Sequence, residues 1–278
     1  MRTRTAPLAT QVVLLVVDGL RPDAVTADLA PSLHALAERG WQTVARTVTP
    51  SVTMAALTSL GSGVSPARHG FTAPRFPSLA RFGRLRPLPR ELRRHGRSSI
   101  LVVRDLPPTH RLLARGLLGF AGFGGIATGG ATPWSVADAA VRAARTTAFT
   151  AVYVDDCDRA GHAHGWMSGP YLEAVARVDR AVALLAVVLE RAGCLLLVTA
   201  DHGGGGVQPD DHDQPHPLNE SIPLIAAGRM VPGGMRCTSP AHLLDIPPTI
   251  LAALGVPAPP CWEGRPLRTL LEGELVLR

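Results

Sequence analysis

The sequence predicts an α/β fold, with a mostly parallel central sheet, helices on both of its faces and only a minimal cap. Short apolar runs rich in valine and leucine alternate with stretches of helical spacing along the chain. Aspartate and histidine follow several of these runs directly, at the position where open α/β sheets place their active sites. The 278 residues are 46% hydrophobic and contain no repeat or low-complexity linker. We therefore expect a single catalytic domain over residues 1–278.

The first part of the chain supplies three predicted strands, at residues 12–17, 43–48 and 99–103, and helices at residues 31–40 and 87–96. Between them, Pro50 ends the second strand, and the apolar spacing that follows is helical. Thr53 then lies near a helix N-terminus, where free N–H groups favour anions. Its hydroxyl is either a helix cap or a nucleophile aimed at a phosphoryl group.

The stretch at about residues 104–133 is the least regular, with six glycines between residues 119 and 130. It predicts a loop-rich insertion, which is either a mobile lid over the site or an ordinary loop. The remaining pattern is again alternating. We expect strands at residues 150–154, 194–198 and 222–227, and helices at residues 133–145, 171–191 and 242–255.

Carboxylates and imidazoles gather after three of these strands. Asp18 follows the first strand, and Asp201-His202 follows the run at residues 194–198. Asp158 and His162 are four residues apart after the strand at 150–154, so one helical turn would direct both at one ion. Each group alone is more typical of a helix cap, a turn or a solvated loop than of a metal site. Together they indicate a site for divalent metal ions, zinc most easily.

The amino-acid composition of the chain limits the classes of binding partner that we expect. The 28 basic residues are all arginine, and the net charge of +6 could attract an anionic substrate. These arginines are mostly scattered and aromatic residues make up only 4%, so we do not expect nucleic-acid binding. The apolar run at residues 12–17 is too short to span a membrane, and it leads into no cleavage site. We expect a cytoplasmic protein without membrane contact, whose four widely spaced cysteines are reduced thiols; no pattern indicates an oligomeric state.

The order and spacing of five motifs, from Val12 to about Leu267, resemble the type I phosphodiesterase/nucleotide pyrophosphatase family of the alkaline phosphatase superfamily. The motifs are Val-Val-Asp18-Gly-Leu-Arg-Pro-Asp, Pro50-Ser-Val-Thr53 with the segment to His69-Gly70, Asp158-Arg-Ala-Gly-His162, Thr199-Ala-Asp201-His202-Gly203 and Asp245-Ile-Pro-Pro-Thr249. The resemblance implies an alkaline phosphatase-like fold and a metal-dependent hydrolase that cleaves phosphoester bonds.

The resemblance also implies roles for individual residues. Thr53 would be the nucleophile and would form a covalent phospho-threonine intermediate. Two divalent ions would be bound, zinc first, with manganese as the alternative. One ion would be held by Asp18, Asp201, His202 and the Thr53 oxygen, and the other by Asp158, His162 and a later histidine. Two positions compete for that last ligand, because both His216 and His212 have spacings to Ile222-Pro223 that occur among relatives; we favour His216, with His212 as the alternative.

The sequence departs from the family where substrate is recognised. Relatives that act on nucleotides carry an Asn shortly after the His-Gly pair, whereas His69-Gly70 is followed by Phe71-Thr72-Ala73-Pro74. Activity on phosphomonoesters or phosphonates therefore remains an alternative to a phosphodiesterase or nucleotide pyrophosphatase activity. Substrate contacts would come from loops at residues 72–84 and 106–132. A non-catalytic binding protein on this scaffold would predict lost ligands or a lost nucleophile, and all are present.

Overall fold

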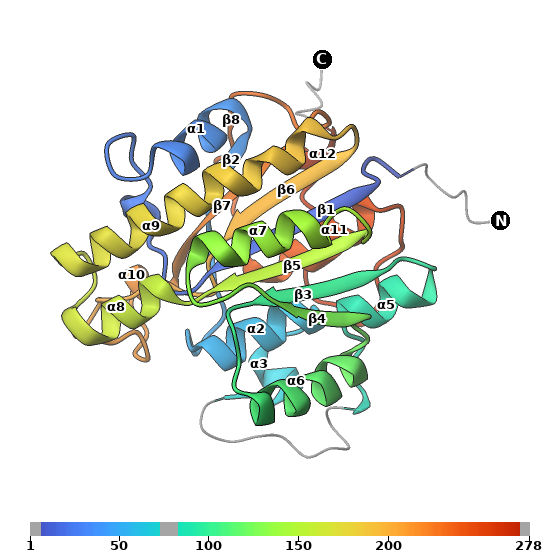
Figure 1. Cartoon of the computed structure of the whole chain (residues 1–278), viewed down its shortest axis with the longest axis horizontal. Coiled ribbons are helices and arrows are strands. Elements are labelled where there is room, and N and C mark those ends of the chain that lie inside the picture. Colours follow the sequence, from blue (N-terminus) through green and yellow to red (C-terminus); the bar gives the residue numbers. More distant parts are fainter. Residues whose placement is uncertain (1–6, 73–82, 273–278) are drawn as a thin grey trace.

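The computed structural model describes residues 7–72 and 83–272 and contains an eight-stranded sheet with helices on both faces (Figure 1). This architecture confirms the predicted fold class. From one edge to the other, the strands are β4 (Gly125–Thr128), β3 (Ser99–Val103), β5 (Phe149–Val154), β1 (Gln11–Val17), β6 (Cys194–Thr199), β7 (Ser221–Ala227), β2 (Trp41–Arg46) and β8 (Met235–Arg236).

The centre of the sheet is parallel. β1 pairs in parallel with β5 and β6, so that Val12 lies opposite both Phe149 and Leu195. Its residues from Val12 to Val17 are all buried, as expected of an unbroken apolar strand covered on both faces. β7 runs antiparallel to β6 and β2. Because β1, β5 and β6 are parallel, the residues that follow them all emerge at one edge of the sheet.

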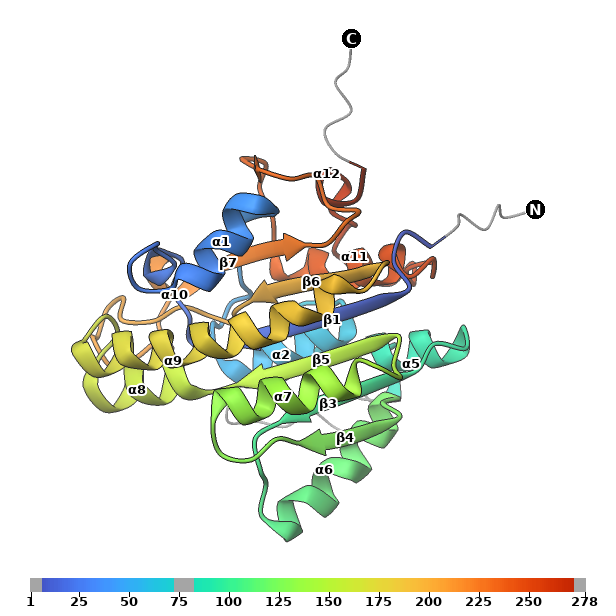
Figure 2. The same cartoon turned by 45° about the horizontal axis from the view of Figure 1, so that its top comes forward.

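The helices form two layers, which are seen on opposite sides of the sheet in Figures 1 and 2. One face is covered by α1 (Pro31–Arg39), α7 (Pro133–Ala143) and α9 (Gly169–Leu185). The other face is covered by α2 (Thr53–Ser62), α5 (Leu88–Arg94) and α11 (Ile246–Ala253). The shorter or peripheral elements are η1 (Pro22–Ala24), α3 (Pro66–His69), α6 (Pro108–Ala121), α8 (Asp156–His164), η2 (Ala186–Glu190), α10 (Pro217–Glu220), η3 (Leu243–Asp245) and α12 (Arg268–Glu272).

The stretch at residues 104–133 differs from the expected loop-rich insertion, because it contains α6 and the edge strand β4. Its glycines have separate structural reasons. Gly119 lies within α6, where an added Cβ would meet nothing within 4 Å. Gly122 ends the helix at φ +102°, a conformation that glycine adopts without strain. Gly129 packs against the backbone of Val136. The glycine content therefore marks a helix end and a close contact rather than a long loop.

Two expectations lie partly outside the described residues. The predicted substrate loop at residues 72–84 falls mostly within residues 73–82, and a group of several arginines between residues 81 and 97, an exception to the otherwise scattered distribution, begins there. Within the described part of the chain, no helix combines the length and apolar character needed to cross a membrane.

Candidate metal centre

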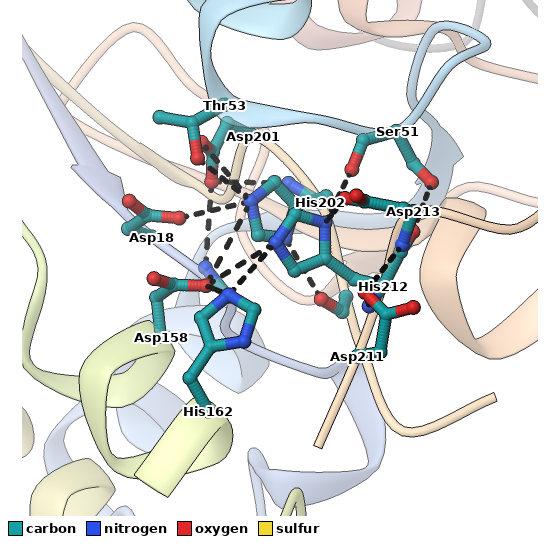
Figure 3. A network of polar contacts seen from close by, with 12 residues as sticks. Asp18, Ser51, Thr53, Asp158, His162, Asp201, His202, Asp211, His212 and Asp213 are labelled. Atoms are coloured by element: carbon teal, nitrogen blue, oxygen red, sulfur yellow. Dashed lines mark hydrogen bonds and ion pairs between the residues drawn. The ribbon is translucent and has the colours of Figure 1, made fainter. Parts of the chain in front are cut away.

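The predicted strand-end residues come together at the carboxyl edge of the central strands. Asp18 directly follows β1, Asp201 and His202 follow β6, and α8 carries Asp158 after β5. Thr53, the first residue of α2, approaches from a separate segment. In Figure 3 these side chains point toward one another around a common centre. The parallel pairing of β1 with β5 and β6 thus converts a dispersed sequence pattern into one cluster.

A glycine allows α8 to reach the tip of β1. Gly19 has φ +69°, and a Cβ added there would lie 2.9 Å from the Cα of Asp158. The Asp158 amide donates a 3.0 Å hydrogen bond to the Asp18 carbonyl oxygen. The Gly19 carbonyl accepts from Trp166 Nε1 at 2.9 Å and from the Tyr171 hydroxyl at 3.0 Å. The close approach at Gly19 and the bond between the Asp158 amide and the Asp18 carbonyl oxygen set these two aspartates beside each other.

The first ligand group consists of Asp18, Asp201 and His202, which are 2%, 0% and 0% exposed. His202 donates through Nδ1 to the Gly203 carbonyl oxygen at 2.8 Å, so its Nε2 faces the carboxylates. That Nε2 lies 3.1 Å from Asp18 Oδ1 and 3.6 Å from Asp201 Oδ2. Thr53 Oγ1 is also 3.1 Å from it. A hydroxyl group therefore lies against a buried set of oxygen and nitrogen donors.

The second group consists of Asp158, His162 and His212. The two Nε2 atoms of the histidines are 3.1 Å apart, and they lie 3.4 Å and 3.6 Å from Asp158 Oδ1. Each ring donates through Nδ1 to a backbone carbonyl oxygen at 2.8 Å, His162 to Asp210 and His212 to Ser51. Zn–N bonds of about 2.0–2.1 Å in tetrahedral geometry bring two nitrogen ligands to about 3.4 Å from each other. The observed spacing is close to that value.

Of the two competing late histidines, the structure brings His212 into the cluster and leaves the favoured His216 outside it. His216 caps α10, where its Nδ1 accepts from the Leu218 amide at 3.1 Å, and its ring packs against Gly206. His212 is 5% exposed and stacks on His202 with ring centroids 3.7 Å apart. The turns between β6 and α10 determine which histidine faces the centre. The number of residues between each histidine and the next strand, on which the prediction rested, does not reveal these turns.

Burial and the neighbouring charges shift the pKa values of the side chains in the cluster. Burial, with the charge of Asp18, raises the pKa of Asp158 to about 6. Burial also raises the pKa of Asp201 well above its usual range, with Asp18 again adding to the effect. Burial opposes a charge on His202, but Asp201 and Asp18 outweigh it and raise its pKa to about 10. Burial lowers the pKa of His212 to about 4, so this imidazole is neutral at pH 7.

The donor set fits divalent metal ions. Among the described residues, three buried carboxylate oxygens have no hydrogen-bond partner: Asp18 Oδ1, Asp158 Oδ1 and Asp201 Oδ2. Buried polar atoms are normally paired, so three orphaned oxygens in one cluster require an explanation. A cation bound by these oxygens and by the Nε2 atoms of the histidines would provide it. Carboxylate oxygen and imidazole nitrogen are ligands for zinc and manganese.

Three residues that contact the candidate ligands were not predicted from the sequence. The Tyr153 hydroxyl donates to Asp18 Oδ2. Ser51 accepts from His212 Nδ1 and donates through Oγ to the His212 carbonyl oxygen at 2.7 Å. Trp166 packs edge-on against His162, with centroids 5.1 Å apart and planes at 80°. Ser51 lies within the motif Pro50-Ser-Val-Thr53, so the sequence could have indicated that it lies at the site. Tyr153 and Trp166 lie in none of the five motifs, which therefore gave no such indication for them.

Comparison with known proteins identifies the family. The chain matches the family model described as type I phosphodiesterase / nucleotide pyrophosphatase over residues 12–80 and 124–245. The chain belongs to this family. Membership confirms the resemblance found in the motifs.

Curated relatives include 2,3-bisphosphoglycerate-independent phosphoglycerate mutases. That of Synechococcus elongatus is 32% identical over 139 residues, which are 47% of this chain and 26% of the mutase. That of Saccharophagus degradans is 36% identical over 115 residues, 40% of this chain and 21% of the mutase. The matched segments thus span about a quarter or less of the length of these relatives.

Solved structures share the fold at low sequence identity. Human ectonucleotide pyrophosphatase / phosphodiesterase 5 superposes with a TM-score of 0.74 at 14% identity, covering 94% of this chain and all of that chain (100%). The phosphonate monoester hydrolase from Silicibacter pomeroyi gives a TM-score of 0.72 at 17% identity, covering 95% of this chain and 77% of that chain. The fold is therefore of the alkaline phosphatase type.

Proposed function

We propose that this protein is a two-metal phosphoester hydrolase of the phosphodiesterase type, with Thr53 as the nucleophile. The observation that carries the proposal is the position of Thr53 Oγ1, 3.1 Å from His202 Nε2 at the first residue of the ten-residue helix α2. This hydroxyl lies both at the ligand cluster and at a helix N-terminus. Each environment favours a negatively charged group, such as a phosphoryl group, at that point.

The proposed ligands follow the two groups of side chains. One ion is assigned to Asp18, Asp201, His202 and the Thr53 oxygen. The other is assigned to Asp158, His162 and His212, with His212 in place of His216. Zinc is the first choice and manganese the alternative, because the donors are carboxylate oxygens and imidazole nitrogens. Bound ions would lower the pKa of the Thr53 hydroxyl and neutralise charge on the phosphoryl group.

The reaction proceeds in two displacements. Thr53 Oγ1 loses its proton to solvent and bonds to phosphorus while the opposite ester P–O bond breaks; the ester group leaves as an alcohol or phenol with a proton from solvent, and the phosphoryl group remains on Thr53. Water then attacks phosphorus, breaks the bond to Thr53 and restores the hydroxyl. The first N–H groups of α2 have no partner within the helix and are available to the phosphoryl oxygens. The Nδ1–H bonds to Gly203 and Ser51 keep the rings of His202 and His212 oriented throughout.

The proposed substrate is a small anionic phosphoester. Membership of the phosphodiesterase family favours a diester, whereas the absence of an Asn after His69-Gly70 argues against nucleotide specificity. A phosphomonoester or a phosphonate is the alternative, because a phosphonate monoester hydrolase has the same fold.

The test compares bis-p-nitrophenyl phosphate, p-nitrophenyl phosphate and p-nitrophenyl phenylphosphonate, each with zinc-loaded and manganese-loaded enzyme. The diester is expected to be cleaved fastest, and Thr53→Ala is expected to lower that rate at least about 1,000-fold. Thr53→Ser, which keeps a hydroxyl, should retain measurable activity. Faster monoester or phosphonate cleavage would replace the diester assignment, and full activity in Thr53→Ala would remove the nucleophile assignment.

A further inference from the structure

An apolar cavity of about 260 Å³ lies close to the metal centre, on the same face of the sheet as α2. Its walls come from β1, β3 and β5 and from α2, α5 and α6, all of which are labelled in Figure 1. An engineered apolar cavity of about 150 Å³ accommodates benzene, so by proportion this one has room for roughly ten carbon atoms.

The lining offers an occupant almost no hydrogen bonds. The walls include Leu14, Leu57, Leu60 and Ala151, and among the described lining residues only Tyr153 has a polar side chain. The Tyr153 hydroxyl already donates to Asp18 Oδ2. Water needs two to four polar partners to be held in a cavity, and this lining does not supply them. The chemistry of the walls therefore selects an apolar group.

The space results from small residues on facing elements. Along β5, Ala151 and Tyr153 are partly exposed, while Thr150, Val152 and Val154 between and beside them are buried. The face of this central strand that lines the cavity is thus incompletely covered. Across the cavity, Gly61 lies in the last turn of α2, and a Cβ added there would meet no atom within 4 Å. In an ordinary hydrophobic core, a larger apolar side chain at one of these positions would fill the space and stabilise the fold.

Two features place the cavity beside the candidate metal centre, a shared tyrosine and a shared helix. Tyr153 lines the cavity with its ring and contacts the ligand Asp18 with its hydroxyl. On α2, Leu57 and Gly61 are four and eight residues after Thr53, so all three share one stripe of the helix. They lie about 6 Å and 12 Å from Thr53 along the helix axis. An ester group attached to a phosphoryl group at Thr53 would reach the cavity along this stripe.

We propose that the cavity binds the apolar ester group of the substrate, so that the substrate class is a phosphoester bearing an alkyl or aryl group of about six to ten carbon atoms. This inference rests on the proposed function of Thr53 and the metal centre. The proposed metal ions and the N-terminus of α2 would hold the anionic end of such a molecule, and the cavity would accommodate its apolar end.

The test is a series of alkyl p-nitrophenyl phosphates from methyl to octyl, which share one leaving group. We expect kcat/KM of the metal-loaded enzyme to rise about three- to fourfold per added methylene until the cavity is filled. In Gly61→Leu, where the new side chain occupies the space, the octyl and methyl esters should be cleaved at similar rates. Ala151→Val narrows the opposite wall and provides a second variant with the same expected direction.

Gly169→Leu is the matched control, because Gly169 begins α9, is exposed and also has no atom within 4 Å of an added Cβ. It should keep the wild-type dependence on chain length. An active wild-type enzyme with equal rates for methyl and octyl esters would overturn the inference while leaving the proposed function intact.

If no ester of the series is cleaved, the proposed function fails, and ligand binding then decides the inference separately. 1-Hexanol is titrated into the protein and followed by NMR of the Ala151 and Leu57 methyl groups. Shifts in the wild type and in Gly169→Leu that are absent in Gly61→Leu support an apolar binding site. Methyl signals that do not respond in the wild type overturn it.

Discussion

The histidines divide by what their Nδ1 atom does. In three of them Nδ1 donates to a backbone carbonyl oxygen and Nε2 faces the candidate metal centre: His162, His202 and His212. His95, at the end of α5, makes the same kind of bond to Glu91 away from that centre. In three others Nδ1 accepts from the amide two residues later, which ties the ring to its own turn: His69, His216 and His242. Only the first arrangement presents a lone pair away from the backbone. The role of a histidine here follows from its local backbone rather than from its residue type.

This distinction predicts that His212→Ala and His216→Ala have different effects on metal binding. His212→Ala removes a proposed ligand and should weaken binding of one of two zinc ions at least about 100-fold. His216→Ala removes a helix cap, which costs about 1 kcal/mol of stability, and should keep the wild-type metal stoichiometry. Isothermal titration of zinc into each metal-free variant measures the zinc affinity and the number of ions bound. Lost stoichiometry in His216→Ala alone would reverse the ligand assignment.

A second residue-level prediction concerns Tyr153, whose hydroxyl bonds to the proposed ligand Asp18. Tyr153→Phe should weaken metal binding about 10- to 100-fold, because outer hydrogen bonds orient and tune metal ligands. Tyr171→Phe is the control. Its hydroxyl bonds to Gly19 and Arg21 rather than to a ligand, so it should lower stability without a matching change in metal affinity. Equal metal affinities for Tyr153→Phe and the wild type would refute the positioning role.

At the scale of elements, the metal centre depends on how closely α8 approaches β1. Gly19, at φ +69° with Asp158 against it, is the point of closest approach. Gly19→Ala should lower the free energy of unfolding by about 1–3 kcal/mol, because an alanine there is both strained and crowded. Gly116→Ala in α6, where an added Cβ meets nothing, should be neutral or stabilising by up to about 1 kcal/mol. Urea unfolding of both variants checks this, and similar losses in the two would contradict it.

The elements also show what sequence patterns can and cannot predict. β1 and β6 were predicted because their apolar runs are unbroken, and the aspartates after them were found for the same reason. α6 was missed because glycines interrupt its pattern without interrupting its backbone. The place of His212 depends on contacts with Ser51, which is 161 residues away. Strand ends are encoded locally, whereas the partners that complete the site are set by tertiary packing.

At the scale of the whole molecule, the sheet gathers buried Asp18 and Asp201, which follow β1 and β6, and half-buried Asp158 of α8 around the histidines. The raised pKa of Asp158, about 6, means that the metal-free fold binds a proton more tightly than the unfolded chain does. Its contribution to stability is therefore lost as pH rises from about 4 to about 6. A bound cation would reverse this loss by replacing the proton.

It follows that stabilisation by metal should depend on pH. At pH 5 zinc must displace the proton of Asp158 and, because the pKa of His202 is raised to about 10, compete with a proton for that imidazole; at pH 8 this competition is weaker. The increase in unfolding temperature on adding zinc should therefore be larger at pH 8 than at pH 5, and activity should fall at acid pH. Thermal unfolding with and without zinc across this range measures the effect, and a constant increase would contradict it.

The most direct test of the central claim is to find the phosphoryl group on Thr53. Metal-loaded enzyme is mixed with bis-p-nitrophenyl phosphate, quenched in acid during turnover, digested and examined by mass spectrometry. The account predicts that the peptide containing Thr53 carries the phosphoryl part of the substrate and that Thr53→Ala carries none. Modification of a different residue, or the same labelling in Thr53→Ala, would show that Thr53 is not the nucleophile.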